Sequence, residues 1–304
     1  MTGPDLSFDQ RLRWSAISFL KQLASDGNLL VRQSDLEQFS FEGQNIRLMA
    51  PQQGIWKPRQ LTAALSFRTV YTADPNKRPY DDNDGDDGYP RYKWRGDNPQ
   101  HPDNRALREA MVLGLPLIFF QGVASGLYFP ICPVWLADEE PNLQQFVVSV
   151  EEELLRARTE LAEDPVLLRS YAERVVQVRL HQPVFRQRVL LAYQNKCALC
   201  HLKHTRLLDA AHVIPDAEGG EPVVTNGISM CKIHHAAYDA NIFGINPDYR
   251  IGVRPDVMEE IDGPTLRYTL QGIDGSKMDL PKSRAAKPNP DALHVRWKQF
   301  LDAS

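Results

Sequence analysis

The chain has 304 residues, a formal net charge of −4, 42% hydrophobic residues and 24% charged residues. This length suffices for two domains, and the composition excludes a disordered or fibrous protein. No apolar run approaches the roughly 18–20 residues that a membrane helix needs. The N-terminus lacks a basic start followed by an apolar segment, so we expect no secretory signal, a cytoplasmic location and no membrane partner.

The first 145 residues predict a mixed α+β domain with many short strands. Apolar positions recur at helical spacing over residues 8–25, and short strand-like signals follow from 28 to 75. An acidic, glycine-containing loop at 80–88 precedes a further strand. A helix is expected over residues 101–114, where a proline follows a capping residue, and two apolar strands come after it.

The rest of the chain divides into a helical linker, expected at residues 146–185, and a C-terminal domain at 186–304. Within that domain, residues 195–255 predict a compact ββα unit, and the tail predicts one last helix. Residues 171–206 hold seven Lys or Arg against one acidic residue. Such a basic segment is either the solvated face of a helix or a surface that binds a polyanion.

Three of the four cysteines lie in a pattern typical of a metal site. Cys197 and Cys200 form a Cys-x2-Cys pair, and Cys231 and His234 form a Cys-x2-His pair thirty residues later. Four such ligands in two pairs suit tetrahedral zinc, so we expect a structural Zn²⁺ here. Cys132 stands apart in an apolar strand-like run and is interpreted as a small core residue.

Two further histidines lie close to this pattern. His212 ends a short apolar strand and is followed at once by a turn, and taken alone it is better interpreted as a buried core histidine. His235 is turned about 100° from His234 on the expected helix, and Asp239 lies on the same face as His235. Imidazole and carboxylate in this spacing can hold a divalent cation, although most such pairs are surface hydrogen bonds.

His212, Asn226 and His235 follow one another in the order and approximate spacing of the HNH, or ββα-metal, nuclease motif. The segment "LLDAAHVIPDAEGGEPVVTNGISMCKIHHAAYDANIFGI" resembles the subtype with Ala-Ala-His in its first strand and His-x3-Asp in its helix. The resemblance covers about residues 195–255.

This resemblance implies that His212 is the general base and that Asn226 holds the loop and orients His212. It also implies that His235 and Asp239 bind one catalytic cation, Mg²⁺ or another divalent ion such as Mn²⁺. Many relatives carry a further ligand immediately before the base, where this chain has Ala211. Asp209, two residues earlier on the same strand face, is the expected substitute.

The N-terminal domain carries a candidate base-binding site. Tyr80 and Tyr92 flank the acidic loop, and aromatic rings of this kind can sandwich a flipped base. Arg91, Lys93 and Arg95 could contact phosphate. The alternative interpretation is a surface hairpin with an acidic loop.

Residues 60–130 resemble the SRA family, whose PUA-like, β-barrel-type domains flip a modified cytosine. In that family two tyrosines sandwich the base, and an Asp three residues after the first tyrosine reads it. That position is Asn83 here, so either neighbouring acid, Asp82 or Asp84, is the expected reader.

A reader of this kind ahead of an HNH nuclease implies a modification-dependent restriction endonuclease used in bacterial defence. We expect it to bind double-stranded DNA that carries 5-methylcytosine or 5-hydroxymethylcytosine, and to act as a homodimer because one HNH site cuts one strand. Two alternatives remain. An HNH DNase could respond to a nucleotide messenger or a partner, or the chain could be a non-catalytic DNA-reading module with a structural zinc knot.

Overall fold

The computed structural model describes residues 7–24, 29–72, 84–160, 164–261 and 263–303. The chain separates into two compact units, Met1–Val184 and Phe185–Ser304. The boundary falls inside one helix, next to residue 186, where the C-terminal domain was expected to begin. The helices of the expected linker at 146–185 group with the first unit.

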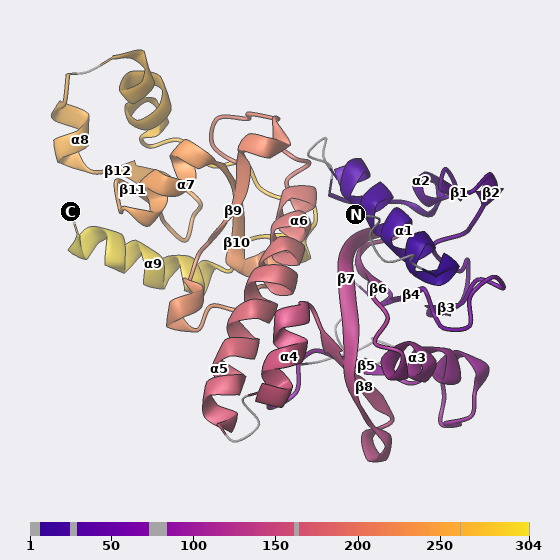
Figure 1. The fold of residues 1–304 in the computed structure, drawn as a ribbon. Coiled ribbons are helices and arrows are strands. Elements are labelled where there is room, and N and C mark those ends of the chain that lie inside the picture. The colour runs from indigo at the N-terminus through magenta and orange to yellow at the C-terminus, as the bar shows by residue number, and fades with distance from the viewer. Residues whose placement is uncertain (1–6, 25–28, 73–83, 161–163, 262, 304) are drawn as a thin grey trace, which may run out of the picture. The chain divides into compact units, whose positions relative to one another are not determined.

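A six-stranded sheet is the centre of the first unit, and it curls into a half-barrel (Figure 1). Its strand order is β3-β4-β6-β7-β8-β5, and the β4–β6 pair is parallel while the other neighbours are antiparallel. The strands are β3 (Ile55–Trp56), β4 (Ser66–Arg68), β5 (Arg91–Lys93), β6 (Leu117–Ala124), β7 (Leu127–Glu140) and β8 (Gln145–Ser149).

Helices flank this sheet on either side of β7 (Figure 1). The predicted opening helix is α1, which buries one apolar stripe that includes Leu12, Ile17 and Leu20 against Ile118 and Phe120 of β6. Helix α1 spans Phe8–Ala24. The remaining elements on this side are α2 (Gln33–Leu36), the hairpin β1 (Ser40–Phe41) and β2 (Gln44–Asn45), and α3 (Pro102–Val112).

The expected helical segment after the sheet consists of α4 (Glu152–Glu160), α5 (Pro165–Val176) and α6 (Gln182–Ala192). A turn of π-helix at Gln177–His181 joins α5 to α6. Asp164 caps α5, because its side chain accepts a hydrogen bond from the backbone N–H of Leu167 at 3.0 Å.

The second unit contains the predicted ββα arrangement. It is built from β9 (Leu208–His212), β10 (Gly227–Cys231) and α7 (Lys232–Asp239), and β9 pairs antiparallel with β10. Around it lie β11 (Phe243–Ile245), β12 (Ile251–Val253), α8 (Pro255–Glu259) and the last helix, α9 (Pro290–Asp302). The predicted α+β class is thereby confirmed, with a half-barrel in the first unit and a ββα element in the second.

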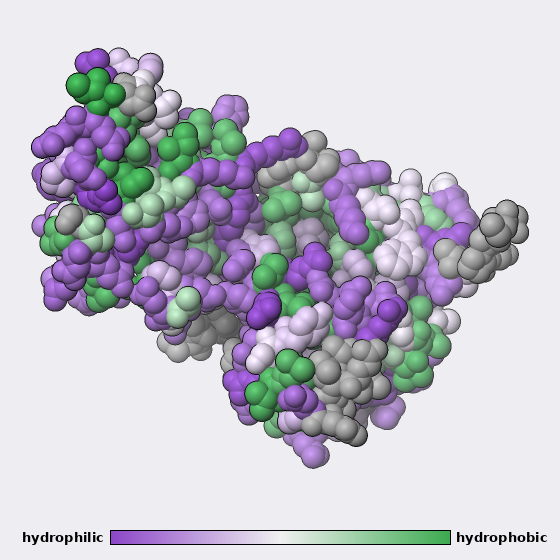
Figure 2. Space-filling view, turned by 60° about the vertical axis from the view of Figure 1, so that its left-hand side comes forward, coloured by the Kyte–Doolittle hydropathy of each residue, from purple (hydrophilic) through white to green (hydrophobic). Residues whose placement is uncertain are grey.

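Hydrophilic residues cover most of the face drawn in Figure 2, and hydrophobic residues form separate patches on it. This distribution is ordinary for a globular surface. Among the helices that the structure describes, none combines the length and the apolar character needed to cross a bilayer.

Candidate active site and metal cluster

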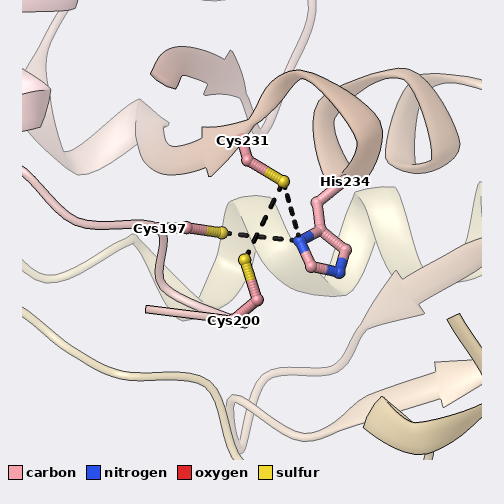
Figure 3. A group of neighbouring side chains, drawn as sticks. All are labelled: Cys197, Cys200, Cys231 and His234. Atoms are coloured by element: carbon pink, nitrogen blue, oxygen red, sulfur yellow. Dashed lines mark hydrogen bonds between the residues drawn. The ribbon is translucent and has the colours of Figure 1, made fainter. Parts of the chain in front are cut away.

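The four residues of the predicted zinc site converge in the second unit (Figure 3). One potential ligand atom from each of them lies within 4.8 Å of the others. His234 Nδ1 is 3.2 Å from Cys231 Sγ and 3.5 Å from Cys197 Sγ, and Cys200 Sγ is 3.9 Å from Cys231 Sγ. Three sulfurs and one imidazole nitrogen form the Cys₃His donor set of closed structural zinc sites.

The surrounding backbone orients these donors. Cys231 ends β10 and occupies the N-cap of α7, which places His234 in the first turn of that helix. His234 Nε2 donates to the carbonyl oxygen of Thr269 at 2.8 Å, since a carbonyl can only accept. That bond leaves Nδ1 free of its proton and directed at the sulfurs, as metal-binding histidines require.

Pairing of β9 with β10 positions the second group of side chains. His212, the last residue of β9, pairs with Gly227, the first residue of β10. Asn226 immediately precedes Gly227 and is buried, 7% exposed. His212 and Asn226, fourteen positions apart in the sequence, are thus neighbours where β9 and β10 pair.

Asn226 fastens the loop that follows His212. Its Oδ1 accepts from the Ile214 backbone N–H at 2.9 Å, and its Nδ2 donates to the carbonyl oxygens of Ile214 and Glu221 at 3.0 Å each. A Cβ on Gly220 would collide with the Ile214 carbonyl, so the loop closes only with glycine there. Asn226 therefore holds this loop in place, and its role in orienting His212 stays a prediction.

The imidazole of His212 is held by stacking. Its ring lies on Phe185 of α6 with centroids 4.2 Å apart and planes at 21°. A Cβ on Gly227 would collide with Phe185 and Val189, so the missing side chain lets α6 approach this closely. Burial lowers the pKa of His212, although nearby acids, Asp216 first among them, act in the opposite direction. His212 Nε2 is buried and has no hydrogen-bond partner among the described residues.

His235 lies between two carboxylates. Its Nδ1 is 3.6 Å from Asp209 Oδ2, and its Nε2 is 3.4 Å from Asp239 Oδ2. Asp209 also lies 3.6 Å from Nε of Arg186. The hydrogen bond with Asp209 is the main reason that the pKa of His235 is raised. For Asp209, burial alone would raise the pKa, but the bond with His235 and other contacts outweigh it and lower the pKa.

A cavity of about 450 Å³ connects these groups with parts of the chain that the motif does not include. His212, His235 and Asp239 form part of its wall. The other lining residues, which the sequence analysis did not identify, are Pro215, Asp216, Glu218, Asn241, Arg296 and Gln299. One signal in the sequence was available, because Arg296 interrupts the apolar stripe of the last helix between Leu293 and Phe300.

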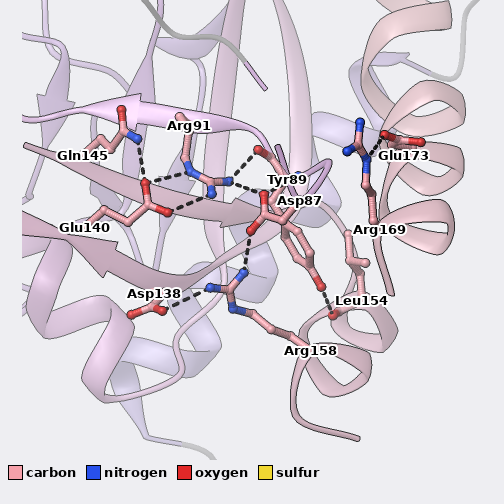
Figure 4. A network of polar contacts seen from close by, with 10 residues as sticks. All are labelled: Asp87, Tyr89, Arg91, Asp138, Glu140, Gln145, Leu154, Arg158, Arg169 and Glu173. Carbon is pink, nitrogen blue, oxygen red and sulfur yellow. Dashed lines mark hydrogen bonds and ion pairs between the residues drawn. The ribbon is translucent and has the colours of Figure 1, made fainter. Parts of the chain in front are cut away.

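The proposed phosphate ligands of the first unit are engaged inside it. Arg91 is only 9% exposed, and its guanidinium contacts Glu140 at 2.8 Å and Asp87 at 2.9 Å (Figure 4). Arg158 extends the network from Asp87 to Asp138. A buried arginine with two carboxylate partners stabilises the sheet, and phosphate contact by Arg91 stays a prediction.

The neighbouring candidates also have internal partners. Tyr92 is 7% exposed, its ring packs on Phe67 with centroids 4.7 Å apart, and its hydroxyl donates to the Arg68 carbonyl at 3.2 Å. Lys93 Nζ donates to Gln145 Oε1 at 2.6 Å, and Arg95 pairs with Asp103 at 2.5 Å. The structure therefore places the Tyr92 ring in the core of the first unit.

The acidic loop is described only in part. Tyr80, Asp82 and Asn83 lie outside the described residues. Asp84 is exposed, and its Oδ2 lies 2.6 Å from Nε2 of His181. The structure thus does not bring Tyr92 and Asp84 together into one pocket among the described residues.

Comparison with known proteins identifies the second unit. Residues 197–246 match the family described as HNH endonuclease, so this unit contains an HNH endonuclease domain, a phosphodiester hydrolase. The match includes the Cys₃His residues and every expected member of the HNH site.

Two solved structures are similar to the chain. The modification-dependent TagI restriction endonuclease has 15% identity and a TM-score of 0.28, over 82% of this chain and 85% of that one. The Type IV phosphorothioation-dependent restriction endonuclease ScoMcrA has 17% identity and a TM-score of 0.26, over 62% of this chain and 48% of that one. The comparison with curated proteins gave no match.

Proposed function

We propose, starting from an HNH endonuclease domain at residues 197–246, that this protein cleaves double-stranded DNA selected by a modified cytosine. His212 is the general base, Asn226 orients it, and His235 with Asp239 and Asp209 holds one divalent cation. The observation that carries the nuclease site is the unpartnered Nε2 of His212 in a cavity shared with His235 and Asp239.

Neutral imidazole is suited to the task of His212. Because burial lowers its pKa, the ring is held in the unprotonated form that can take a proton from a water molecule. Phe185 fixes the ring plane by stacking, and Asn226 fixes the loop on the other side. The base therefore faces the cavity with little freedom to rotate, which favours a defined direction of attack.

The donors around His235 suit a hard or borderline cation. One imidazole and two carboxylates gather within hydrogen-bonding range of each other, and carboxylate with imidazole is a donor set that Mg²⁺ or Mn²⁺ accepts. A cation bound there would supply positive charge that stabilises the phosphoryl transition state and the leaving oxygen. Asp209 takes the part that Ala211 cannot, since its carboxylate already reaches His235.

Zinc is the proposed occupant of the Cys₃His cluster. The donor types, their convergence and the Thr269 carbonyl behind His234 fit a closed tetrahedral site. Its role is to hold the strand β10 and the helix α7 together, because Cys231 and His234 belong to the same elements that carry the HNH residues.

The proposed reader is the first unit, through the SRA-like segment at residues 60–130. With Tyr92 in the core and Arg91 paired internally, the reading groups are proposed to come from the acidic loop at 80–88, which includes Tyr80, Asp82, Asn83 and Asp84. The same two observations favour a second candidate, an HNH nuclease triggered by a nucleotide messenger or a partner.

Digestion of matched DNA substrates tests the proposal. Unmodified, 5-methylcytosine and 5-hydroxymethylcytosine duplexes would be incubated with the protein in Mg²⁺ and in Mn²⁺. We expect cleavage of a modified duplex, and a loss of about 10²–10⁴-fold or more in the His212→Ala variant. Equal cleavage of all three duplexes would reject modified-cytosine reading and favour the second candidate. Parent-like cleavage by His212→Ala would reject His212 as the base.

A homodimer is proposed because one HNH site hydrolyses one strand. Sedimentation of the protein on a duplex with a single modified site should give two chains per DNA, with linear rather than nicked plasmid as the product. A monomer that only nicks would contradict this part of the proposal without affecting the site assignments.

A further inference from the structure

Arg296 reaches the proposed active-site cavity from the last helix of the chain. It lies on the buried side of α9 together with Leu293 and Phe300, and it is 7% exposed. Its side chain forms part of the wall that also contains His212 and His235. The helix lies more than fifty residues beyond the HNH motif, so no motif-based reasoning includes it.

The contacts that the structure describes for this arginine are with neutral groups. Nη2 donates to the Tyr238 carbonyl oxygen at 2.8 Å, and Nη1 donates to Gln299 Oε1 at 3.3 Å. The guanidinium carbon lies 4.9 Å from the centroid of the Tyr238 ring. Among the residues that the structure describes, no carboxylate forms an ion pair with Arg296. A guanidinium has five N–H donors, and a buried charge without a counter-charge is costly.

Arg296 is a positive charge in a cavity that several acidic residues line. Asp216, Glu218 and Asp239 line the same cavity and are acidic. Arg296 is the one lysine or arginine among the described lining residues. Asp216 and Glu218 are not proposed cation ligands and repel a phosphodiester, so a fixed guanidinium in the same wall would lower the cost of bringing a phosphate to His212.

Gln299 fixes the direction of the guanidinium. Its Oε1 accepts from Arg296, and its Nε2 donates to Glu218 Oε2 at 2.9 Å. The chain from Glu218 through Gln299 to Arg296 thus ties α9 to the loop that follows His212. This relay keeps the acid of Glu218 bonded to an amide rather than to the arginine.

We propose that Arg296 binds the DNA phosphate that enters this cavity and that Gln299 is its positioning residue. This inference rests on the proposed nuclease function and adds a phosphate-binding residue to it. The structural alternative is that Arg296 only stabilises the C-terminal end of α7, where Tyr238 lies, by bonding its last carbonyls.

Binding in a cleavage-deficient background separates these roles. Arg296→Gln and Gln299→Ala are each combined with His212→Ala, and the dissociation constant for a short duplex is measured over a range of salt concentrations. We expect Arg296→Gln to weaken binding about tenfold or more and to reduce the salt slope by about one. Gln299→Ala should weaken binding several-fold. Lys298→Gln removes an exposed charge on the same helix and is the control. It should change the dissociation constant and the salt slope less than Arg296→Gln does.

Cleavage provides the second readout. In the background with His212 intact, Arg296→Gln should lower the single-turnover rate about 10²–10³-fold, as loss of one transition-state donor does. Circular dichroism and zinc content report whether the variant is folded, and if it is not, the half-exposed Gln299→Ala variant decides the outcome. The inference is overturned if a folded Arg296→Gln variant binds with the same affinity and salt slope as His212→Ala alone. If Arg296→Gln does not fold, the same result in Gln299→Ala overturns it. If the parent protein cuts no DNA, the nuclease proposal fails, whereas the binding measurement still decides the role of Arg296.

Discussion

The two units treat their buried charges in opposite ways. In the first unit, Arg91 is enclosed by Asp87 and Glu140, so every charge of the network has an opposite charge beside it (Figure 4). In the second unit, Arg296 has only neutral partners within the described part of the chain, and Nε2 of His212 has none there. Both regions are polar and partly buried, yet only one is electrostatically complete.

This difference separates structural from functional polarity. Buried polar groups are almost always satisfied, so a complete network needs no further explanation than the stability of the sheet. A network in which a buried polar group lacks a partner indicates that a group from outside the network completes it. The sequence analysis predicted phosphate binding by Arg91, which has carboxylate partners inside the first unit, whereas the phosphate-binding role that we propose falls to Arg296.

The largest expected effect concerns the cluster on which the second unit depends. Cys231→Ser removes a central ligand, and zinc in small finger peptides contributes about 10–16 kcal/mol at pH 7. We expect the second unit to unfold and to lose its zinc, as seen by limited proteolysis and elemental analysis. Cys132→Ser, outside the cluster, should keep the zinc. Folded parent protein with less than about half an equivalent of zinc would contradict the closed-site assignment.

Removal of one carboxylate from the Arg91 network should lower the stability of the first unit. Glu140→Gln leaves the buried guanidinium of Arg91 short of a counter-charge, and the expected loss is about 1.5–3 kcal/mol in the free energy of unfolding. Urea unfolding measures it. Glu152→Gln disrupts the exposed pair with Arg156 and serves as the control, with an expected change below about 1 kcal/mol. Equal losses in the two variants would show that burial of the Arg91 network does not matter.

The same network predicts a pH dependence. The hydrogen bond from Arg91 lowers the pKa of Glu140; for Asp87, burial acts to raise the pKa, but Arg91 and its other contacts lower it overall. A lowered folded-state pKa contributes stability above the unfolded value, which is about 4.3 for Glu, and that stability is lost as pH falls through the folded value. Urea unfolding of the parent below pH 4.5 should therefore show a steeper fall than that of Glu140→Gln. Parallel pH curves would refute the linkage.

The smallest effect sharpens the assignment of Tyr92. Tyr92→Phe removes the hydroxyl that donates to Arg68, and the expected cost is about 0.5–1.5 kcal/mol of stability. Because the ring stays in the core, the ratio of affinities for modified and unmodified duplexes should not change. A change in that ratio without loss of stability would mean that Tyr92 contacts the base after all.

The sequence by itself determined the features that depend on short spacing. Cys-x2-Cys, Cys-x2-His and His-x3-Asp are local patterns, and a helix or a turn converts them directly into neighbouring side chains. His234 therefore faces the cysteines, and His235 faces Asp239, as expected. By contrast, the pairing of His212 with Gly227, next to Asn226, was not predicted, because the long loop over residues 213–226 does not by itself fix the register of the two strands.

Only the tertiary structure decided which distant residues share a site. Arg91 meets Glu140 forty-nine positions away, and Arg296 meets the motif through a helix at the end of the chain. Whether an arginine is neutralised inside a sheet or left facing a cavity depends on what packs against it, and nothing in its immediate sequence encodes that. Local spacing fixes which residues lie together on one element, but the burial and counter-charge that give a side chain its chemistry come from elements folded against it.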